Sequence, residues 1–98
     1  MNLMRLFWAF VLLFSTFSMQ AMTLETKGNT LYASGEIGDD YVAFETAFKN
    51  PEIDTLVLVN SPGGDLWNGL RIGRMIAGKS IKTVVAGRCI SSCSLLFI

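Results

Sequence analysis

The sequence predicts an α/β domain in which an N-terminal β-hairpin precedes a parallel sheet of βα units. Two short runs, residues 55–59 (TLVLV) and 81–85 (IKTVV), are rich in Val, Ile and Leu, as strands are. In the first run, Leu and Val follow one another without alternating with polar residues, which is typical of a parallel strand buried on both faces. Each run leads through a turn into a helical pattern, so the predicted order is β-β-α-β-α-β-α. Right-handed crossovers would make the two strands parallel neighbours.

Length and charge limit the classes of protein that fit. The chain has 98 residues, 51% of them hydrophobic, with eight basic and eight acidic side chains. That length allows one small domain. Nucleic acid is excluded as a partner because its phosphates require clustered Lys and Arg.

Residues 1–21 have the three parts of a signal peptide. Arg5 supplies the positive charge, and residues 6–17 (LFWAFVLLFSTF) form the apolar segment. Ala21 is the small residue expected just before the cleavage point. The apolar segment is short for a helix that must cross a hydrocarbon layer of about 30 Å. We therefore expect a cleaved signal and an exported domain, residues 22–98, in the periplasm or secreted. An uncleaved anchor, which would be the chain's one membrane contact, and a buried helix remain alternatives.

The first elements of the exported part are a hairpin and a helix. Residues 22–37 read as two strands around a turn at 27–29 (KGN). Asp39 or Asp40 is placed to cap the helix that follows, and Asn50-Pro51 ends it. Its apolar face is predicted to consist of Tyr41, Phe44, Ala47 and Phe48.

Two further helices follow the two predicted strands. Asp65 can cap the first of them, and Gly78 ends it. Its apolar face is predicted to be Leu66, Leu70, Gly73 and Ala77, flanked by Trp67, Met75 and Ile76. The Trp, Phe and Met side chains of these helices are expected in the core. The last helix would begin at Ser91, and its apolar end, residues 94–98, predicts a domain that is incomplete at its C-terminus.

The first motif that could carry chemistry is residues 60–65 (NSPGGD), between a strand and a helix. Pro62 fixes its own φ, and Gly63 can adopt the positive φ that a type II turn needs next. Gly64 has no side chain, so its N–H is open to an approaching carbonyl oxygen or anion. A plain turn without chemistry is the alternative.

The second motif is residues 86–94 (AGRCISSCS), again between a strand and a helix. A serine at such an elbow, Ser91 or Ser92, lies where backbone N–H groups stabilise developing negative charge. Either serine could instead act only as a helix cap. Both motifs follow the carboxyl ends of parallel strands, the edge at which ligands bind.

Cys89 and Cys93 flank the elbow. In an oxidising compartment they can form a disulfide, which we favour over two reduced thiols. A metal site or a nucleophilic Cys is less well supported, because two thiols without His leave zinc under-coordinated. We expect no cofactor and no bound metal.

With these motifs, residues 31–98 resemble the Clp protease proteolytic subunit and its exported relatives, within the crotonase-like fold. The most specific segments are NSPGG and GRCISSCSLLF. The resemblance implies that Ser91 is the nucleophile of a serine endopeptidase-like site. It implies an oxyanion hole made by the N–H groups of Gly64 and Ser92, with Gly63 as the alternative to Gly64. It also implies a peptide or protein substrate and a homo-oligomeric parent. Cys93 stands where the classical enzyme of the family has Gly, whereas the exported relatives often have paired cysteines around the serine.

The family's base is a His oriented by an Asp, and this chain contains no His. A Ser–Lys dyad is not expected, because Lys79 and Lys82 flank the start of a strand, at the opposite edge from the elbow. We therefore expect the amino-terminal part of an exported peptidase, inactive alone. A non-catalytic binding or assembly module of the same fold is the alternative. An acyl-thioester enzyme fits the leader poorly, since coenzyme A is cytoplasmic.

Overall fold

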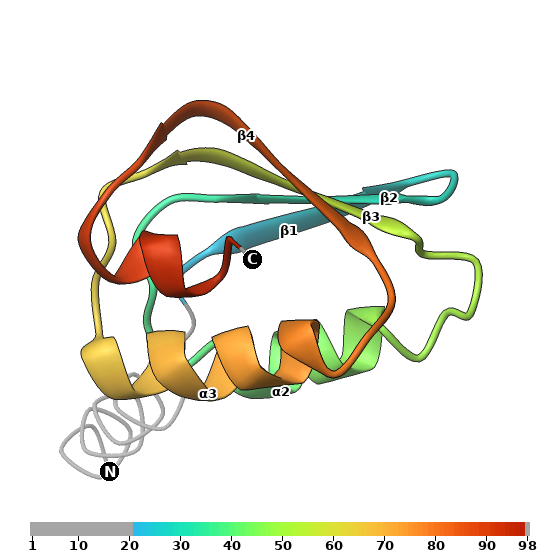
Figure 1. Cartoon of the computed structure of the whole chain (residues 1–98), viewed down its shortest axis with the longest axis horizontal. Helices are drawn as coiled ribbons and strands as arrows, with labels where there is room; N and C mark the ends of the chain where they lie inside the picture. Colours follow the sequence, from blue (N-terminus) through green and yellow to red (C-terminus); the bar gives the residue numbers. More distant parts are fainter. Residues whose placement is uncertain (1–20, 98) are drawn as a thin grey trace, which may run out of the picture.

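A computed structural model describes residues 21–97, in which four strands form one mixed sheet and the helices lie beside it (Figure 1). The predicted signal peptide, apart from Ala21, lies outside the described residues. In chain order the elements are β1 (Thr23–Lys27), β2 (Thr30–Ser34), α2 (Tyr41–Ala47), β3 (Thr55–Ser61), α3 (Leu66–Ala77), β4 (Lys82–Cys89) and the 3₁₀-helix η1 (Ser91–Leu95). The α/β class and the predicted order of elements are confirmed, except that the last helix is a 3₁₀-helix.

The sheet has the strand order β1-β2-β3-β4. β1 and β2 form the predicted antiparallel hairpin, with Gly28 at positive φ in its turn. β2 pairs with β3 in parallel, and β3 pairs with β4 in parallel, so that Leu58 lies opposite Val85. The predicted parallel pairing of residues 55–59 with 81–85 is confirmed.

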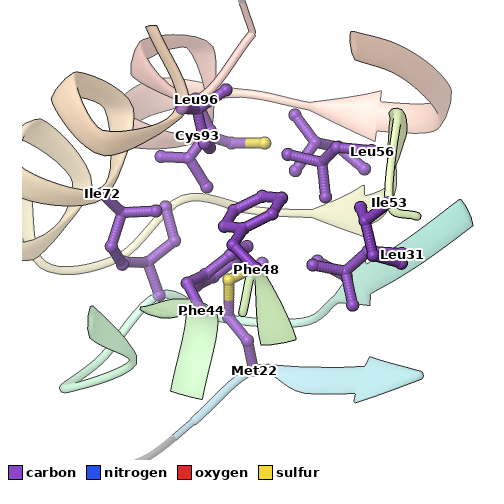
Figure 2. Packing of buried hydrophobic residues seen from close by; sticks show 13 residues of the cluster. Met22, Leu31, Phe44, Phe48, Ile53, Leu56, Ile72, Cys93 and Leu96 are labelled. Atoms are coloured by element: carbon purple, nitrogen blue, oxygen red, sulfur yellow. The ribbon is translucent and has the colours of Figure 1, made fainter. Parts of the chain in front are cut away.

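The helices cover one face of this sheet. Figure 1 shows α2, α3 and η1 on the same side of it. Leu56 and Leu58 point toward the helices and are buried, whereas Val57 and Val59 on the opposite face are half-buried. The prediction that residues 55–59 are buried on both faces is wrong for the described part of the chain, because both crossovers return on the same side. The core (Figure 2) consists of Met22, Leu31, Ala33, Ile37, Phe44, Phe48, Ile53, Leu56, Leu58, Ile72, Ile76, Cys93 and Leu96.

The apolar face of α3 is rotated from the predicted one. Its buried residues are Gly69, Ile72, Gly73 and Ile76. Leu66 and Trp67 are exposed, Trp67 by 74%, so the prediction that they face the core is wrong. Gly69 and Gly73 face inward because η1 packs closely against them.

The two predicted caps behave differently. The Asp65 side chain accepts a hydrogen bond from the Asn68 N–H at 2.9 Å, which confirms it as the cap of α3. Asp40 occupies the N-cap position of α2 but makes no side-chain cap bond. Its carboxylate is instead turned toward the backbone N–H groups of Gly38, Ala21 and Met22.

β4 extends beyond the predicted strand, residues 81–85, and includes residues 86–89 of the second motif. Val59 pairs with Ala86 and Ser61 with Cys89, so Gly87 and Arg88 together face Asn60. This bulge leaves Asn60 and Gly87 at positive φ, and the Asn60 Oδ1 accepts a hydrogen bond from the Arg88 N–H at 3.1 Å. A bulge re-aims the strand that follows it. The end of β4 is thereby redirected toward η1.

Candidate functional site

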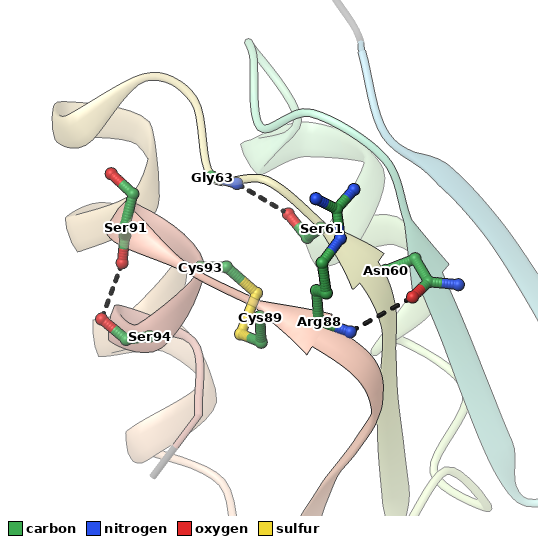
Figure 3. Close-up of a disulfide and its surroundings, with 8 residues drawn as sticks. All are labelled: Asn60, Ser61, Gly63, Arg88, Cys89, Ser91, Cys93 and Ser94. Atoms are coloured by element: carbon green, nitrogen blue, oxygen red, sulfur yellow. Dashed lines mark hydrogen bonds between the residues drawn. A yellow bond between two sulfur atoms is a disulfide. The ribbon is translucent and has the colours of Figure 1, made fainter.

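The loop after β3 is held by hydrogen bonds on two sides. The Gly63 N–H donates to the buried Ser61 Oγ at 3.2 Å (Figure 3). The Ile37 N–H donates to the Gly63 carbonyl at 2.7 Å, and the Asp65 N–H donates to the Ile37 carbonyl at 2.9 Å. Gly63 has φ +96°, which confirms the predicted positive φ after Pro62.

Gly64 fits this position because it has no side chain. Its φ is +143°, and a Cβ there would collide with the backbone of Ile37, including the carbonyl oxygen. Gly64 is exposed, and within residues 21–97 its N–H has no hydrogen-bond acceptor. The N–H of Gly63, in contrast, is already bonded to Ser61. Of the two glycines, Gly64 is therefore the one whose N–H remains available as a hydrogen-bond donor within the described residues.

The elbow after β4 places Ser91 in an uncommon backbone conformation. Ser91 has φ +54°, in a region that non-glycine residues seldom adopt. The Ile90 N–H before it donates to the Ser61 carbonyl at 3.2 Å, so the elbow is joined to the end of β3. Strained backbone of this kind costs about 1–3 kcal/mol and clusters at functional sites.

The two loops meet. A Cβ built on Gly63 would lie 2.8 Å from the Ser91 Cβ and 3.1 Å from the Ser92 nitrogen, so the two loops are in direct contact. The Ser92 Oγ donates a hydrogen bond to the Gly64 carbonyl at 3.1 Å. The convergence expected at the carboxyl edge of the sheet is therefore present.

The three serines of the elbow differ in what their hydroxyl groups do. Ser92 is buried and bonded to Gly64, and the Ser94 Oγ donates to the Ser91 carbonyl at 2.7 Å (Figure 3). Ser91 is exposed, and its hydroxyl has no hydrogen bond to another described residue. Of the three hydroxyl groups, the one on Ser91 is thus the one open to a reactant.

A disulfide joins Cys89 to Cys93, with their Cα atoms 5.2 Å apart. This pairing was predicted and is confirmed. It spans the elbow, linking the end of β4 to η1 around Ser91 (Figure 3). A disulfide of this kind is typical of proteins in oxidising compartments.

Close packing of η1 on α3 is a feature that the sequence analysis missed. A Cβ on Gly73 would collide with the Leu95 carbonyl oxygen, and one on Gly69 would lie 3.2 Å from the Ser92 Cβ. Glycine allows such close backbone approach. The spacing of four between the two glycines, which places them on one helix face, was the available signal.

Lys82, one of the two lysines weighed for a Ser–Lys dyad, lies far from the elbow. Lys82 begins β4, and at about 3.3 Å per residue the strand carries Cys89 roughly 23 Å away from it. Lys82 therefore lies at the far end of β4 from the elbow, as predicted. Among residues 21–97, no group of three or more His, Cys, Asp or Glu side chains could hold a metal ion.

In the part of the chain that the structure describes, no helix is both long and apolar enough to span a membrane. A scan against protein-family models found no match to the chain, and searches of curated proteins and of solved structures found none either. The functional interpretation therefore depends on the geometry of the two loops.

Proposed function

We propose that this chain supplies the nucleophile and the oxyanion hole of an exported serine peptidase of the Clp-protease-like, crotonase-fold type. The observation that supports it most directly is the contact of the Gly63–Gly64 turn with the Ser91 elbow. The mixed sheet with two parallel crossovers is compatible with that fold. The disulfide supports export, because such bonds persist outside reducing compartments.

In this proposal the Ser91 Oγ attacks a peptide carbonyl, and the N–H groups of Gly64 and Ser92 stabilise the resulting oxyanion. Neither N–H has a hydrogen-bond acceptor within residues 21–97, so both are available as donors. Gly64 is exposed, whereas Ser92 is buried, so the Gly64 N–H is the more accessible of the two. One such donor contributes about 3 kcal/mol to transition-state stabilisation. Fixed donors are effective because they need no reorganisation during the reaction.

The proton of the Ser91 hydroxyl needs an acceptor. A serine hydroxyl is a weak nucleophile at neutral pH without a base. The 98 residues contain no His, so a histidine base would have to come from outside this sequence. We therefore propose that the chain alone is inactive, and that the parent acts as a homo-oligomer on peptide or protein substrates.

Labelling with a fluorophosphonate tests the proposal. The protein is produced from its own gene, with whatever residues the gene encodes beyond Ile98, and the labelled peptide is identified by mass spectrometry. We expect a phosphonate ester on the Ser91 Oγ, formed with loss of fluoride, and no labelling of the Ser91→Ala variant. Ser80→Ala is the matched control, because Ser80 is an exposed serine just before β4, at the far end of that strand from the elbow, and the variant should label normally.

Two results would count against the peptidase. Labelling at another serine would show that Ser91 is not the nucleophile. No labelling of a folded protein would instead favour the binding or assembly module, in which the elbow serves only to connect β4 to η1.

A further inference from the structure

The Asp40 carboxyl group is buried and has no cationic side-chain partner within the described part of the chain. Its exposed fraction is 0%, and the one ion pair among residues 21–97 joins Lys27 to Glu25. Arg71, whose guanidinium carbon lies 4.4 Å from the centre of the neighbouring Tyr41 ring, forms no ion pair with Asp40. Buried carboxylates are costly unless they are hydrogen-bonded or paired with a cation. Within the described residues, the stabilisation of the Asp40 carboxylate therefore depends on hydrogen-bond donors and not on a cationic side chain.

The carboxylate binds the backbone at the start of the exported domain. Its Oδ2 accepts from the Gly38 N–H at 2.7 Å, and its Oδ1 accepts from the Ala21 N–H at 3.1 Å. The Met22 nitrogen lies between the two oxygens, 3.1 Å from Oδ1 and 3.3 Å from Oδ2. Met22 itself is 3% exposed, and its side chain packs in the core near Phe44 (Figure 2).

We propose that the mature chain begins at Met22 and that its new α-ammonium group forms a buried ion pair with Asp40. The inference rests on the signal peptide expected in residues 1–21. It does not depend on the proposed peptidase activity. Hydrolysis of the Ala21–Met22 peptide bond by the cell's signal peptidase consumes one water. It leaves a carboxylate on Ala21 and an ammonium on Met22.

The ion pair explains how the buried Asp40 carboxylate remains hydrogen-bonded after the leader is removed. Cleavage removes the Ala21 N–H from Oδ1, but an ammonium has three N–H donors in place of the single one of an amide. Both carboxylate oxygens already lie within hydrogen-bond distance of the Met22 nitrogen. A charge-assisted hydrogen bond is also stronger than a neutral one.

The order of events follows from burial. Because Met22 is almost fully buried, a protease could not reach its peptide bond in the folded domain. The cut must therefore precede folding, as it does when a leader is removed during export. The free amine would then be enclosed as the domain folds.

The ion pair would also stabilise the candidate site. Asp40 binds the Gly38 N–H, and the adjacent residue Ile37 is bonded on both sides to the loop at Gly63 and Asp65. The new N-terminus would thus be linked through Asp40 and Gly38 to Ile37, which supports the loop at Gly63 and Gly64. This provides a structural path from processing to the site.

Mass spectrometry of the exported protein tests the inference. The full 98-residue chain is expressed with its own leader in a bacterium and recovered after export. The folded protein is then treated with an acetylating reagent at neutral pH. We expect an N-terminal peptide that begins at Met22, with its α-amine acetylated at least tenfold more slowly than in the denatured chain. The exposed Lys27 is the internal control and should react in both states. A mature chain that begins at another residue, or an α-amine that reacts equally fast in both states, would overturn the inference.

A matched pair of variants tests the ion pair itself. Asp40→Asn keeps an acceptor but removes the charge, and we expect the α-amine to react at least fivefold faster than in the wild type. Asp39→Asn removes the neighbouring exposed carboxylate and should leave the rate unchanged. Equal rates in the two variants would show that Asp40 is not the partner. If Asp40→Asn does not fold, the protection measured in the wild-type protein decides the question.

Discussion

Gly63 and Ser91 are in direct contact although they belong to different loops. A Cβ added at Gly63 would lie 2.8 Å from the Cβ of Ser91, closer than real side chains approach. The contact brings the end of β3 and the end of β4 to the same point on the sheet edge. It also makes position 63 a sensitive probe of the site.

We predict that Gly63→Ala destabilises the protein and disturbs the elbow. The alanine would adopt an unfavourable positive φ and would also overlap Ser91 and the Ile90 carbonyl. Gly28→Ala is the matched control, because Gly28 also has positive φ but nothing lies within 4 Å of its Cβ position. Gly28→Ala should cost about 1 kcal/mol, and Gly63→Ala should cost about 2 kcal/mol more. Urea denaturation measures both, and equal costs would contradict the contact.

We predict that Gly73→Ala is destabilising even though it lies within a helix. Replacing Gly by Ala in a helix interior ordinarily stabilises by about 1 kcal/mol. Here the new Cβ would collide with the Leu95 carbonyl oxygen and displace η1 from α3, so we expect a loss of about 1–3 kcal/mol. Gly78→Ala at the end of α3 is the control, since its φ is −73° and its nearest contact would be 3.5 Å away. Thermal unfolding measures both variants. If Gly73→Ala were more stable than the wild-type protein, η1 would not pack against this position.

Reduction of the Cys89–Cys93 disulfide should destabilise the domain. The bond closes a five-residue loop, for which the chain-entropy argument gives about 2 kcal/mol. We expect dithiothreitol to lower the midpoint of chemical unfolding of the wild-type protein. The Cys89→Ala, Cys93→Ala double variant should not respond to the reagent. Free thiols in a non-reducing peptide map of the protein would contradict the pairing.

Two aromatic residues should differ sharply in their contribution to stability. Phe44 is fully buried, and its ring is tilted against that of Phe48 with the centroids 6.2 Å apart. Phe44→Ala should therefore lower the free energy of unfolding by about 3–5 kcal/mol. Trp67 is 74% exposed, and Trp67→Ala should change the free energy of unfolding by less than about 0.5 kcal/mol. Denaturant titrations compare the two variants directly. A large loss for Trp67→Ala would mean that another surface covers this residue.

Local patterns determined much of the architecture. The apolar runs at residues 55–59 and 81–85, each followed by a helix, were sufficient to predict two parallel neighbours. Asp65 and Gly63 were predicted correctly because a cap and a positive-φ turn depend on nearby residues alone. The disulfide was likewise predictable from two cysteines four residues apart in a chain whose first residues have the pattern expected of an export signal.

Other features depended on which elements pack together. The buried face of α3 contains the predicted Gly73, but Gly69 rather than Leu66, because η1 comes back to lie against it. Asp40 binds the backbone just before β1 rather than capping its own helix, since the fold brings Met22 within reach of its carboxylate. The amino-acid sequence by itself therefore determined the order of the elements and the residues of the two loops. Only the tertiary structure decided which backbone groups those loops leave open, because hydrogen bonds between distant segments use up the others.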